Sequence, residues 1–286
     1  MSSEKMPRKL EKPLTVKASD RVFLRLYPDC KPHKLEIADL QKGLVLMLGA
    51  SELVGEGIGF GAPVIRYADK TFFSKSAEVS VQGQDEGGVV VSKSFLMDAV
   101  SRKRICRGPF ISDNLYSFFH RAFMRGYEGC KDFRPFFDKI MELRKILGIK
   151  SQFVEVNPRG RVNIVYKCFS DTVQIEVDLR ALDKSGCEEI LILNEQDSSF
   201  FRRYFDTSGL ELFGRQIGAW EKVEADEASF SDINGHLTFS LKRLDQATLF
   251  RGWEEVKGRF SWAGLGYSLK PNISTFTYLV KISMHV

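Results

Sequence analysis

The sequence predicts a mainly β protein, a large antiparallel β-sandwich with a two-helix insertion at residues 112–148. Three observations carry this prediction: period-two alternation of apolar residues in the second half, an Asn-Gly pair between two such runs, and helical spacing inside the insertion. Strands, a helical hairpin and then further strands favour a large sandwich with a helical insertion, because a βαβ sheet would need helices between most strands.

The strands are predicted most clearly after Gln152. In TVQIEVDL, the apolar residues from Val173 to Leu179 occupy every second position, as in a strand with one buried face. The runs RVNIVYK and TFTYLVKIS repeat this alternation. Asn234-Gly235 lies between two further runs, and both residues tolerate the positive φ of a hairpin turn. The pattern predicts mainly antiparallel strands over residues 152–286.

The helical insertion is predicted from spacing and from capping residues. Phenylalanines recur at helical spacing in DNLYSFFHRAFMRG and in DFRPFFDKIMELRKILG. Asp113 and Asp132 are suitable N-caps, and Gly126 and Gly148 are suitable helix ends. Residues 20–100 contain short strand-like runs, and residues 1–19 resemble a flexible basic arm. We therefore expect a single domain over residues 1–286 that carries the arm and the insertion.

Composition narrows the class of protein. The chain is 43% hydrophobic and 28% charged, and it has neither a long apolar run nor a secretory signal, so we expect a cytoplasmic protein without a membrane partner. Five scattered cysteines and four isolated histidines predict no metal site and no disulfide framework, and we expect no cofactor.

A net charge of +5 does not favour nucleic acid as a partner. The densest basic cluster is predicted to lie on a solvated loop, and its role is left open: Arg102, Lys103, Arg104 and Arg107.

Alternate glycines stand out in GEGIGFGAPVIRY, at Gly57, Gly59 and Gly61. A dinucleotide-binding glycine motif needs a helix to begin within it, and a kinase glycine loop needs HRD and DFG motifs elsewhere in the chain. Here Pro63 and a strand-like run follow, and neither kinase motif occurs. The glycines therefore predict a bulge, a bend or close backbone packing, and no bound nucleotide.

The segment Gly61-Ala62-Pro63-Val64 resembles the early Gly-x-Pro-apolar segment of the galactose mutarotase-like sugar epimerases. The resemblance implies a large β super-sandwich and a sugar ligand handled by a histidine and a carboxylate. The chain has Phe60-Gly61-Ala62 where that family has Arg-Gly-Gly, and no histidine lies between His120 and His236. Whether the protein is an enzyme is therefore left open.

The segment FRGWEEVKGRFSWAGLGYSL holds the candidate sugar site. The resemblance puts Glu254 or Glu255 near the family's carboxylate, and we take Glu254 as the candidate catalytic residue. An indole can stack on the apolar face of a sugar, so Trp253 and Trp262 are predicted ligand-binding residues, together with Arg66. The alternative is that Phe260 and Trp262, which alternate along one strand, face the core and that Arg66 is an ordinary exposed residue. Two further aromatic residues of interest are Trp220 and Tyr267.

Three functions remain open at this stage. The first is a carbohydrate-binding or carbohydrate-modifying protein whose partner is a sugar or a sugar phosphate. The second is a non-catalytic interaction protein on the same fold. The third is a binder of an apolar ligand or nucleic acid, which would use the phenylalanine-rich insertion or the basic cluster. The sequence does not identify the substrate or the oligomeric state.

Overall fold

The computed structural model describes residues 8–19, 21–28, 40–55, 57–67, 70–85, 88–106, 149–256 and 260–285. The predicted two-helix insertion at 112–148 lies outside these residues. The chain divides into two compact units, one of Met1–Ala99 with Asn157–Val286 and one of Val100–Val156. The expectation of a single domain stays a prediction. Within the described residues, the one helical element is a short 3-10 turn, η2 (Gly214–Ile217).

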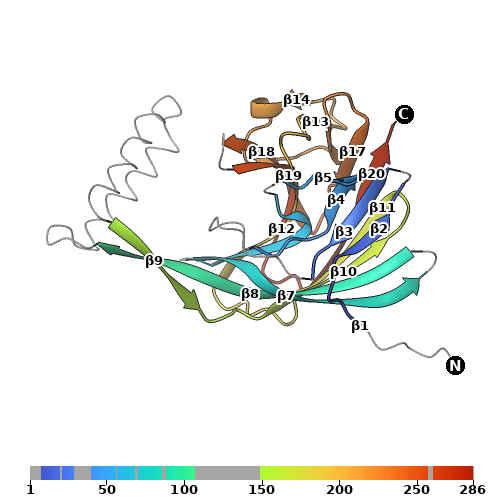
Figure 1. Cartoon of the computed structure of the whole chain (residues 1–286). Helices are drawn as coiled ribbons and strands as arrows, with labels where there is room; N and C mark the ends of the chain where they lie inside the picture. Colours follow the sequence, from blue (N-terminus) through green and yellow to red (C-terminus); the bar gives the residue numbers. More distant parts are fainter. Residues whose placement is uncertain are drawn as a thin grey trace. The chain divides into compact units, whose positions relative to one another are not determined.

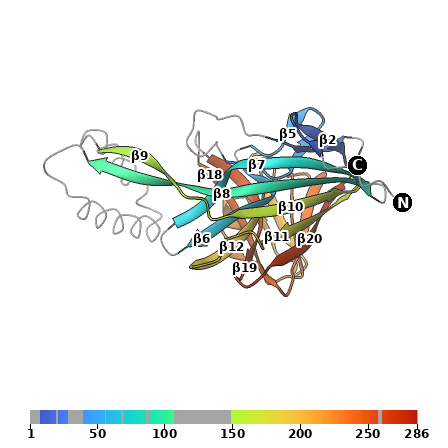
Figure 2. The same ribbon diagram turned by 90° about the horizontal axis from the view of Figure 1, so that it is seen from below.

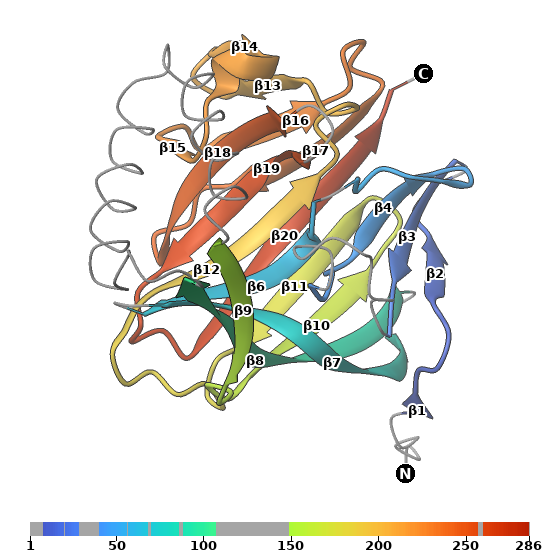
Figure 3. The same ribbon diagram turned by 60° about the vertical axis from the view of Figure 1, so that its left-hand side comes forward.

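Most strands belong to one 16-stranded sheet. Its main path runs β14-β13-β16-β17-β20-β11-β10-β8-β7-β6-β12-β19-β18-β15, while β1 pairs with β7 and β9 pairs with β8. The bounds are β1 (Arg8–Lys9), β6 (Gly59–Tyr67), β7 (Lys70–Asp85), β8 (Gly88–Cys106), β9 (Ile149–Val156), β10 (Arg161–Cys168), β11 (Thr172–Asp178), β12 (Cys187–Gln196), β13 (Arg203–Asp206), β14 (Glu211–Phe213), β15 (Glu221–Lys222), β16 (Glu227–Ser231), β17 (Leu237–Lys242), β18 (Ala247–Val256), β19 (Phe260–Leu269) and β20 (Thr275–Met284). Figure 3 shows β12, β19 and β18 side by side.

The sheet folds over where β6 meets β7, so that two layers face each other across the core (Figure 2). Aromatic rings join the layers: Tyr267 on β19 lies 4.9 Å from Tyr278 on β20, and Phe60 on β6 lies 5.3 Å from Phe239 on β17, measured between ring centroids. Edge-to-face geometry of this kind is favourable for aromatic pairs. The layer of β6, β12, β19 and β18 therefore has an inner face against this core and an outer face turned away from it.

The predicted period-two strands are confirmed. Burial alternates residue by residue along β10, β11 and β20, and each apolar position of TVQIEVD is buried. The Asn234-Gly235 turn is confirmed as the hairpin between β16 and β17, with Gly235 at a φ of 75°. Asp232 stabilises the turn by accepting a hydrogen bond from the Leu237 amide at 2.8 Å.

A separate four-stranded sheet has the order β2-β3-β4-β5 (Figure 1). Its strands are β2 (Leu14–Lys17), β3 (Val22–Leu26), β4 (Val45–Leu48) and β5 (Ser51–Glu52). Part of the predicted flexible arm thus lies in β1 and β2. The buried Lys93 of β8 links the two sheets, because its ammonium donates to the carbonyl oxygens of Tyr27 at 3.0 Å and Lys42 at 2.7 Å.

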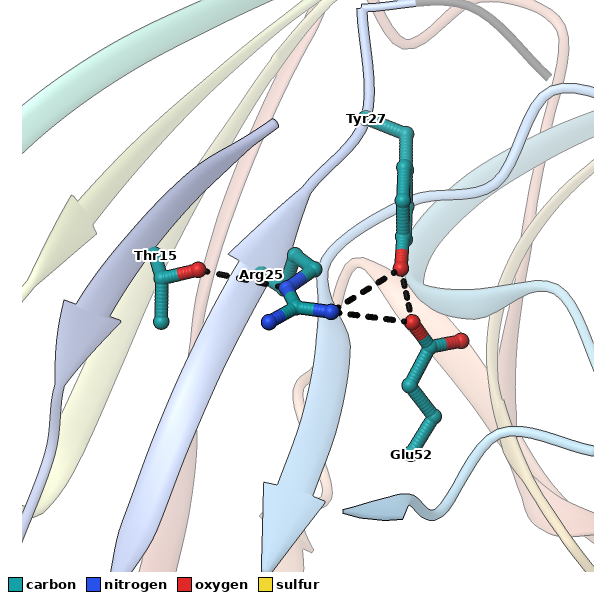
Figure 4. A network of polar contacts seen from close by, with 4 residues as sticks. All are labelled: Thr15, Arg25, Tyr27 and Glu52. Atoms are coloured by element: carbon teal, nitrogen blue, oxygen red, sulfur yellow. Dashed lines mark hydrogen bonds and ion pairs between the residues drawn. The ribbon is translucent and has the colours of Figure 1, made fainter. Parts of the chain in front are cut away.

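The small sheet carries a polar network on one side (Figure 4). Arg25 donates to the hydroxyl of Thr15 on β2 at 3.2 Å and to the carboxylate of Glu52 on β5 at 3.3 Å. The hydroxyl of Tyr27 donates to the same carboxylate. The network joins both edges of the sheet, although partly exposed ion pairs of this kind contribute little free energy of unfolding.

The predicted loop at the basic cluster is wrong for Arg102, Lys103 and Arg104. These residues continue β8, which runs from Gly88 to Cys106. Pairing of β8 with β9 explains the difference, since a partner strand supplies backbone hydrogen bonds that the local sequence does not reveal. Arg107 lies outside the described residues.

The predicted backbone role of the alternate glycines is confirmed. Gly59 and Gly61 have φ values of 77° and 74°, and the register between β6 and β12 shifts beside them. A Cβ atom at Gly57 would lie 2.9 Å from the carbonyl oxygen of Val54. The stretch therefore forms a bulged, closely packed strand entry, for which glycine is the suitable residue.

Candidate functional site

The outer face of β12, β19 and β18 contains a track of glycines. Gly252 on β18 pairs with Gly264 on β19, which pairs with Glu195 on β12, and Gly266 lies further along the same face of β19. Residues paired across two strands point to the same face of a sheet, and so do residues two positions apart on one strand. Gly252, Gly264 and Gly266 therefore leave one continuous strip of this face without side chains, which we call the glycine strip. This strip provides the space in which two large rings lie.

Those rings are the indoles of Trp220 and Trp262, which stack with centroids 4.8 Å apart and planes at 21°. A Cβ atom on Gly252 would lie 2.4 Å from the Trp262 ring, and one on Gly266 would lie 2.9 Å from the Trp220 ring. Any larger residue at these positions would displace the indoles. The glycine strip is thus what allows the stacked pair to lie against the sheet.

Trp220 has an unusual backbone. Its φ is 58°, and no other non-glycine residue of the described chain has a positive φ. This left-handed conformation costs roughly 1 kcal/mol or more for a bulky residue. The Trp220 side chain is nevertheless 37% exposed, whereas Trp262 beneath it is buried. The fold therefore holds a tryptophan at the surface in a strained conformation.

Two carboxylates share the outer face with the stacked pair. Glu254 is registered directly opposite Trp262 and is partly exposed. Glu195 is registered with Gly264, so it lies diagonally from Trp262, a separation of about 7–8 Å between Cα atoms in an antiparallel pair. The stacked indoles and Glu254 thus form a platform with a polar group beside it, which we call the tryptophan platform.

Glu195 is the more buried of the two carboxyl groups, with 8% of its surface exposed. Burial raises its pKa from 4.5 to about 7, while a hydrogen bond from the Ile58 backbone amide opposes the shift. Desolvation is the cause, because an apolar environment disfavours the charged form of a carboxyl group. Shifted carboxyl groups of this kind are more frequent at functional sites than elsewhere.

The structure brings together only part of the predicted site. Trp262 and Glu254 share the outer face, but Trp253 is paired with Ala263 and points to the inner face. Its ring is buried, and its Nε1 donates to the carbonyl oxygen of Ser198 at 3.2 Å. Trp253 is therefore a core residue, and its prediction as a ligand-binding residue is wrong. Glu255 faces away from Glu254, as expected for neighbours in a strand.

Arg66 also lies on the outer face, but at the other end of the sheet. It is registered with Glu189, and its guanidinium is 3.1 Å from the Glu189 carboxylate and 3.8 Å from that of Glu188. Trp262 on β19 lies one position beyond the residue that pairs with Gln196 of β12, whereas Arg66 pairs with Glu189 of β12. Arg66 and Trp262 are therefore separated by roughly 25 Å, measured along β12. Arg66 does not join the tryptophan platform.

Two residues of this region were not among the predicted ligands. In the sequence Trp220 is only an aromatic residue of interest, and the length of chain between it and Trp262 does not indicate that the two side chains meet. The sequence does carry a signal for Glu195, because this residue closely follows the apolar run ILIL, which is typical of a buried strand. The structure shows that the end of this strand is buried as well. Among the described residues, no group of three or more His, Cys, Asp or Glu side chains could hold a metal ion.

The comparisons with known proteins concern architecture only. No family model matches the chain, and no curated protein matches its sequence. It resembles the structure of an alpha-N-acetylgalactosaminidase from Bifidobacterium bifidum in complex with GalNAc, with a TM-score of 0.48 and 8% identity over 95% of this chain. The chain spans 36% of that enzyme's chain.

Two further solved structures are similar along their whole length. A galactose mutarotase-like protein from Lactobacillus casei gives a TM-score of 0.39 at 9% identity, covering 96% of this chain and 100% of that one. A protein from Synechocystis sp. PCC 6803 gives 0.38 at 10% identity, with full coverage of both. The architectural resemblance expected from the sequence is thus present, and it is weak. In the part of the chain that the structure describes, no helix is long and apolar enough to cross a membrane.

Proposed function

We propose that the protein binds a carbohydrate on the outer face of β12, β19 and β18, at the tryptophan platform. The observation that carries the proposal is Trp220, an exposed indole held in a left-handed backbone conformation and stacked on the buried Trp262. Strained residues persist where the surrounding structure over-determines them, and they cluster at functional sites. The stacking on Trp262 holds the conformation, and its result is an indole face that stays open to solvent.

The chemistry of the platform suits a sugar. The apolar face of a pyranose ring packs on an indole, while its hydroxyl groups need acceptors close by. Glu254 supplies a carboxylate on the same face, directly opposite Trp262. Glu195 lies too deep to be assigned as a direct ligand, and we assign the hydroxyl contacts to Glu254.

Tryptophan fluorescence tests the proposal. Titration with a panel of hexoses and hexose phosphates should give a saturable change in the wild-type protein, because Trp220 is exposed and would lie under the ligand. Trp220→Gly should weaken binding by up to about ten-fold, the equivalent of one ring-stacking contact, as measured by calorimetry because this variant lacks the reporting indole. Glycine adopts a positive φ without strain, which offsets part of the packing lost from Trp262, and denaturant unfolding of the variant checks that it is folded.

Trp253→Phe is the matched control. Its indole is buried on the inner face, so the sugar titration should keep its midpoint while the total fluorescence falls. No saturable response to any sugar, by fluorescence and by calorimetry, would refute carbohydrate binding. Equal weakening by Trp253→Phe and Trp220→Gly would place the ligand elsewhere.

A further inference from the structure

A cavity of about 360 Å³ lies at the junction of the two sheets, away from the tryptophan platform. Three segments that are far apart in the sequence line it: the β2–β3 turn, the β10–β11 turn and the end of β20. Its volume falls in the range of small-molecule sites, which begins at about 300 Å³. Nothing in the proposed carbohydrate site accounts for it.

The walls of the cavity are held by backbone hydrogen bonds. The amide of Ser19 donates to the carbonyl oxygen of Val22 at 3.0 Å, which closes the β2–β3 turn. The amide of Ile282 on β20 donates to the carbonyl oxygen of Asp171 at 2.7 Å, which joins the second and third segments. These bonds give the cavity a defined shape before any ligand enters.

The apolar and polar groups of the cavity are segregated. Ala18, Val22 and Ile282 are buried and form an apolar part. Ser170 and Asp171 are exposed and lie at the edge. The lining is therefore mixed: buried apolar side chains form the floor of a depression open to solvent, and polar groups that can orient a ligand lie at its edge.

Two polar groups favour a hydrogen-bond donor in the ligand. The Ser19 hydroxyl is buried and has no hydrogen-bond partner among the described residues, an arrangement that costs free energy until a ligand or water supplies one. Among the described residues that line the cavity, Asp171 is the one that carries a charge, and its Oδ1 accepts a 3.1 Å hydrogen bond from the Thr172 hydroxyl. The lining thus carries a negative charge that an ammonium group would balance.

We propose that this cavity binds a small organic ammonium compound with an apolar body. The apolar body lies against Ala18, Val22 and Ile282, and the ammonium group donates to the Asp171 carboxylate and to a serine hydroxyl. An ammonium has three donors and no acceptor, which matches a wall of carboxylate and hydroxyl oxygens. A carboxylate or phosphate ligand would be repelled by Asp171.

Three probes of the same shape separate the contributions. Cyclohexylamine, cyclohexanol and cyclohexanecarboxylate can be titrated into the isotope-labelled protein while the amide resonances of Ser19, Asp171 and Ile282 are followed. Cyclohexylamine should shift them saturably, cyclohexanol should bind at least about ten-fold more weakly, and cyclohexanecarboxylate should not bind.

Two variants and one control complete the test. Asp171→Asn should lower the affinity for cyclohexylamine to that for cyclohexanol, and Ala18→Leu should fill the apolar part and abolish binding of both. Asp245→Asn removes an exposed carboxylate elsewhere and should change neither affinity. Equal binding of all three probes, an affinity that Asp171→Asn leaves unchanged, or no saturable shift at these amides would each overturn the proposal.

Discussion

Glu195→Gln should raise the free energy of unfolding by about 3 kcal/mol at pH 8 and leave it almost unchanged near pH 4. Burial raises the pKa of the Glu195 carboxyl group from 4.5 to about 7. The folded state therefore binds this proton more tightly than the unfolded state. Between pH 4.5 and 7 the unfolded chain has released the proton and the folded chain has kept it, so wild-type stability falls as the pH rises.

Above pH 7 the carboxylate is ionised in both states, and the full cost of burying the charge remains. Glutamine is neutral at every pH, and its side-chain oxygen can accept the hydrogen bond that the Ile58 amide gives to Glu195. The gain in stability should therefore grow through the same pH window and then level off. About 3 kcal/mol is the upper end, since it takes the whole shift in pKa as a difference in stability.

Urea unfolding of both proteins at several pH values between 4 and 8.5 measures this directly. Glu254→Gln is the matched control, because Glu254 lies on the same outer face and is partly exposed. Its stability should follow the wild-type pH dependence. Parallel curves for wild type and Glu195→Gln would show that the Glu195 carboxyl group is not buried as described.

Asn194→Leu should destabilise the protein by about 4 kcal/mol. Asn194 is fully buried on the inner face of β12, and its Oδ1 accepts hydrogen bonds from the Gly61 amide at 3.1 Å and from the Tyr278 hydroxyl at 2.8 Å. Leucine has a similar size and no acceptor, so both donors would be buried without a partner. Each orphaned group costs roughly 1–3 kcal/mol.

A double-mutant cycle with Tyr278→Phe separates the two bonds. Tyr278→Phe removes the hydroxyl and should cost less than Asn194→Leu, because the Gly61 amide keeps its partner. In the double variant the Tyr278 donor is absent, so the combined cost should be smaller than the sum of the two single costs. Thermal or chemical unfolding supplies the values, and strict additivity would contradict a shared hydrogen bond.

This asparagine also explains how the bulge at the glycine stretch is held. The shift in register between β6 and β12 falls at Leu193 and Asn194, and Gly61 is the residue of β6 left without a partner there. Its amide bonds to the Asn194 side chain instead of the ladder, so the backbone group is satisfied. A Cβ atom at Gly61 would lie 3.1 Å from the Tyr166 ring. Glycine and asparagine thus act together in the core.

Strand content could be predicted because burial on one face leaves a local signal. In β11 the apolar residues alternate with polar ones, and the structure buries the apolar set. The basic cluster at residues 102–104 gave no such signal, because its strand depends on a partner, β9, that lies more than forty residues away in the chain. Pairing between distant strands is decided by the whole sheet, and composition alone does not report it.

Local patterns in the chain predict a mainly β protein, the hairpin at Asn234-Gly235, the backbone role of Gly59 and Gly61, and tryptophans and carboxylates on β18 and β19. Which of these side chains meet depends on the register and the layering of the strands. Trp253 and Trp262 are equivalent candidates in the sequence, and the register of β18 with β19 puts one in the core and the other on the outer face. A strand alternates its side chains residue by residue, so a shift of β18 by one position against β19 would bring Trp253 onto the outer face with Trp262. The left-handed conformation of Trp220 likewise depends on the stacked indole and the glycine strip, which the chain supplies from distant positions.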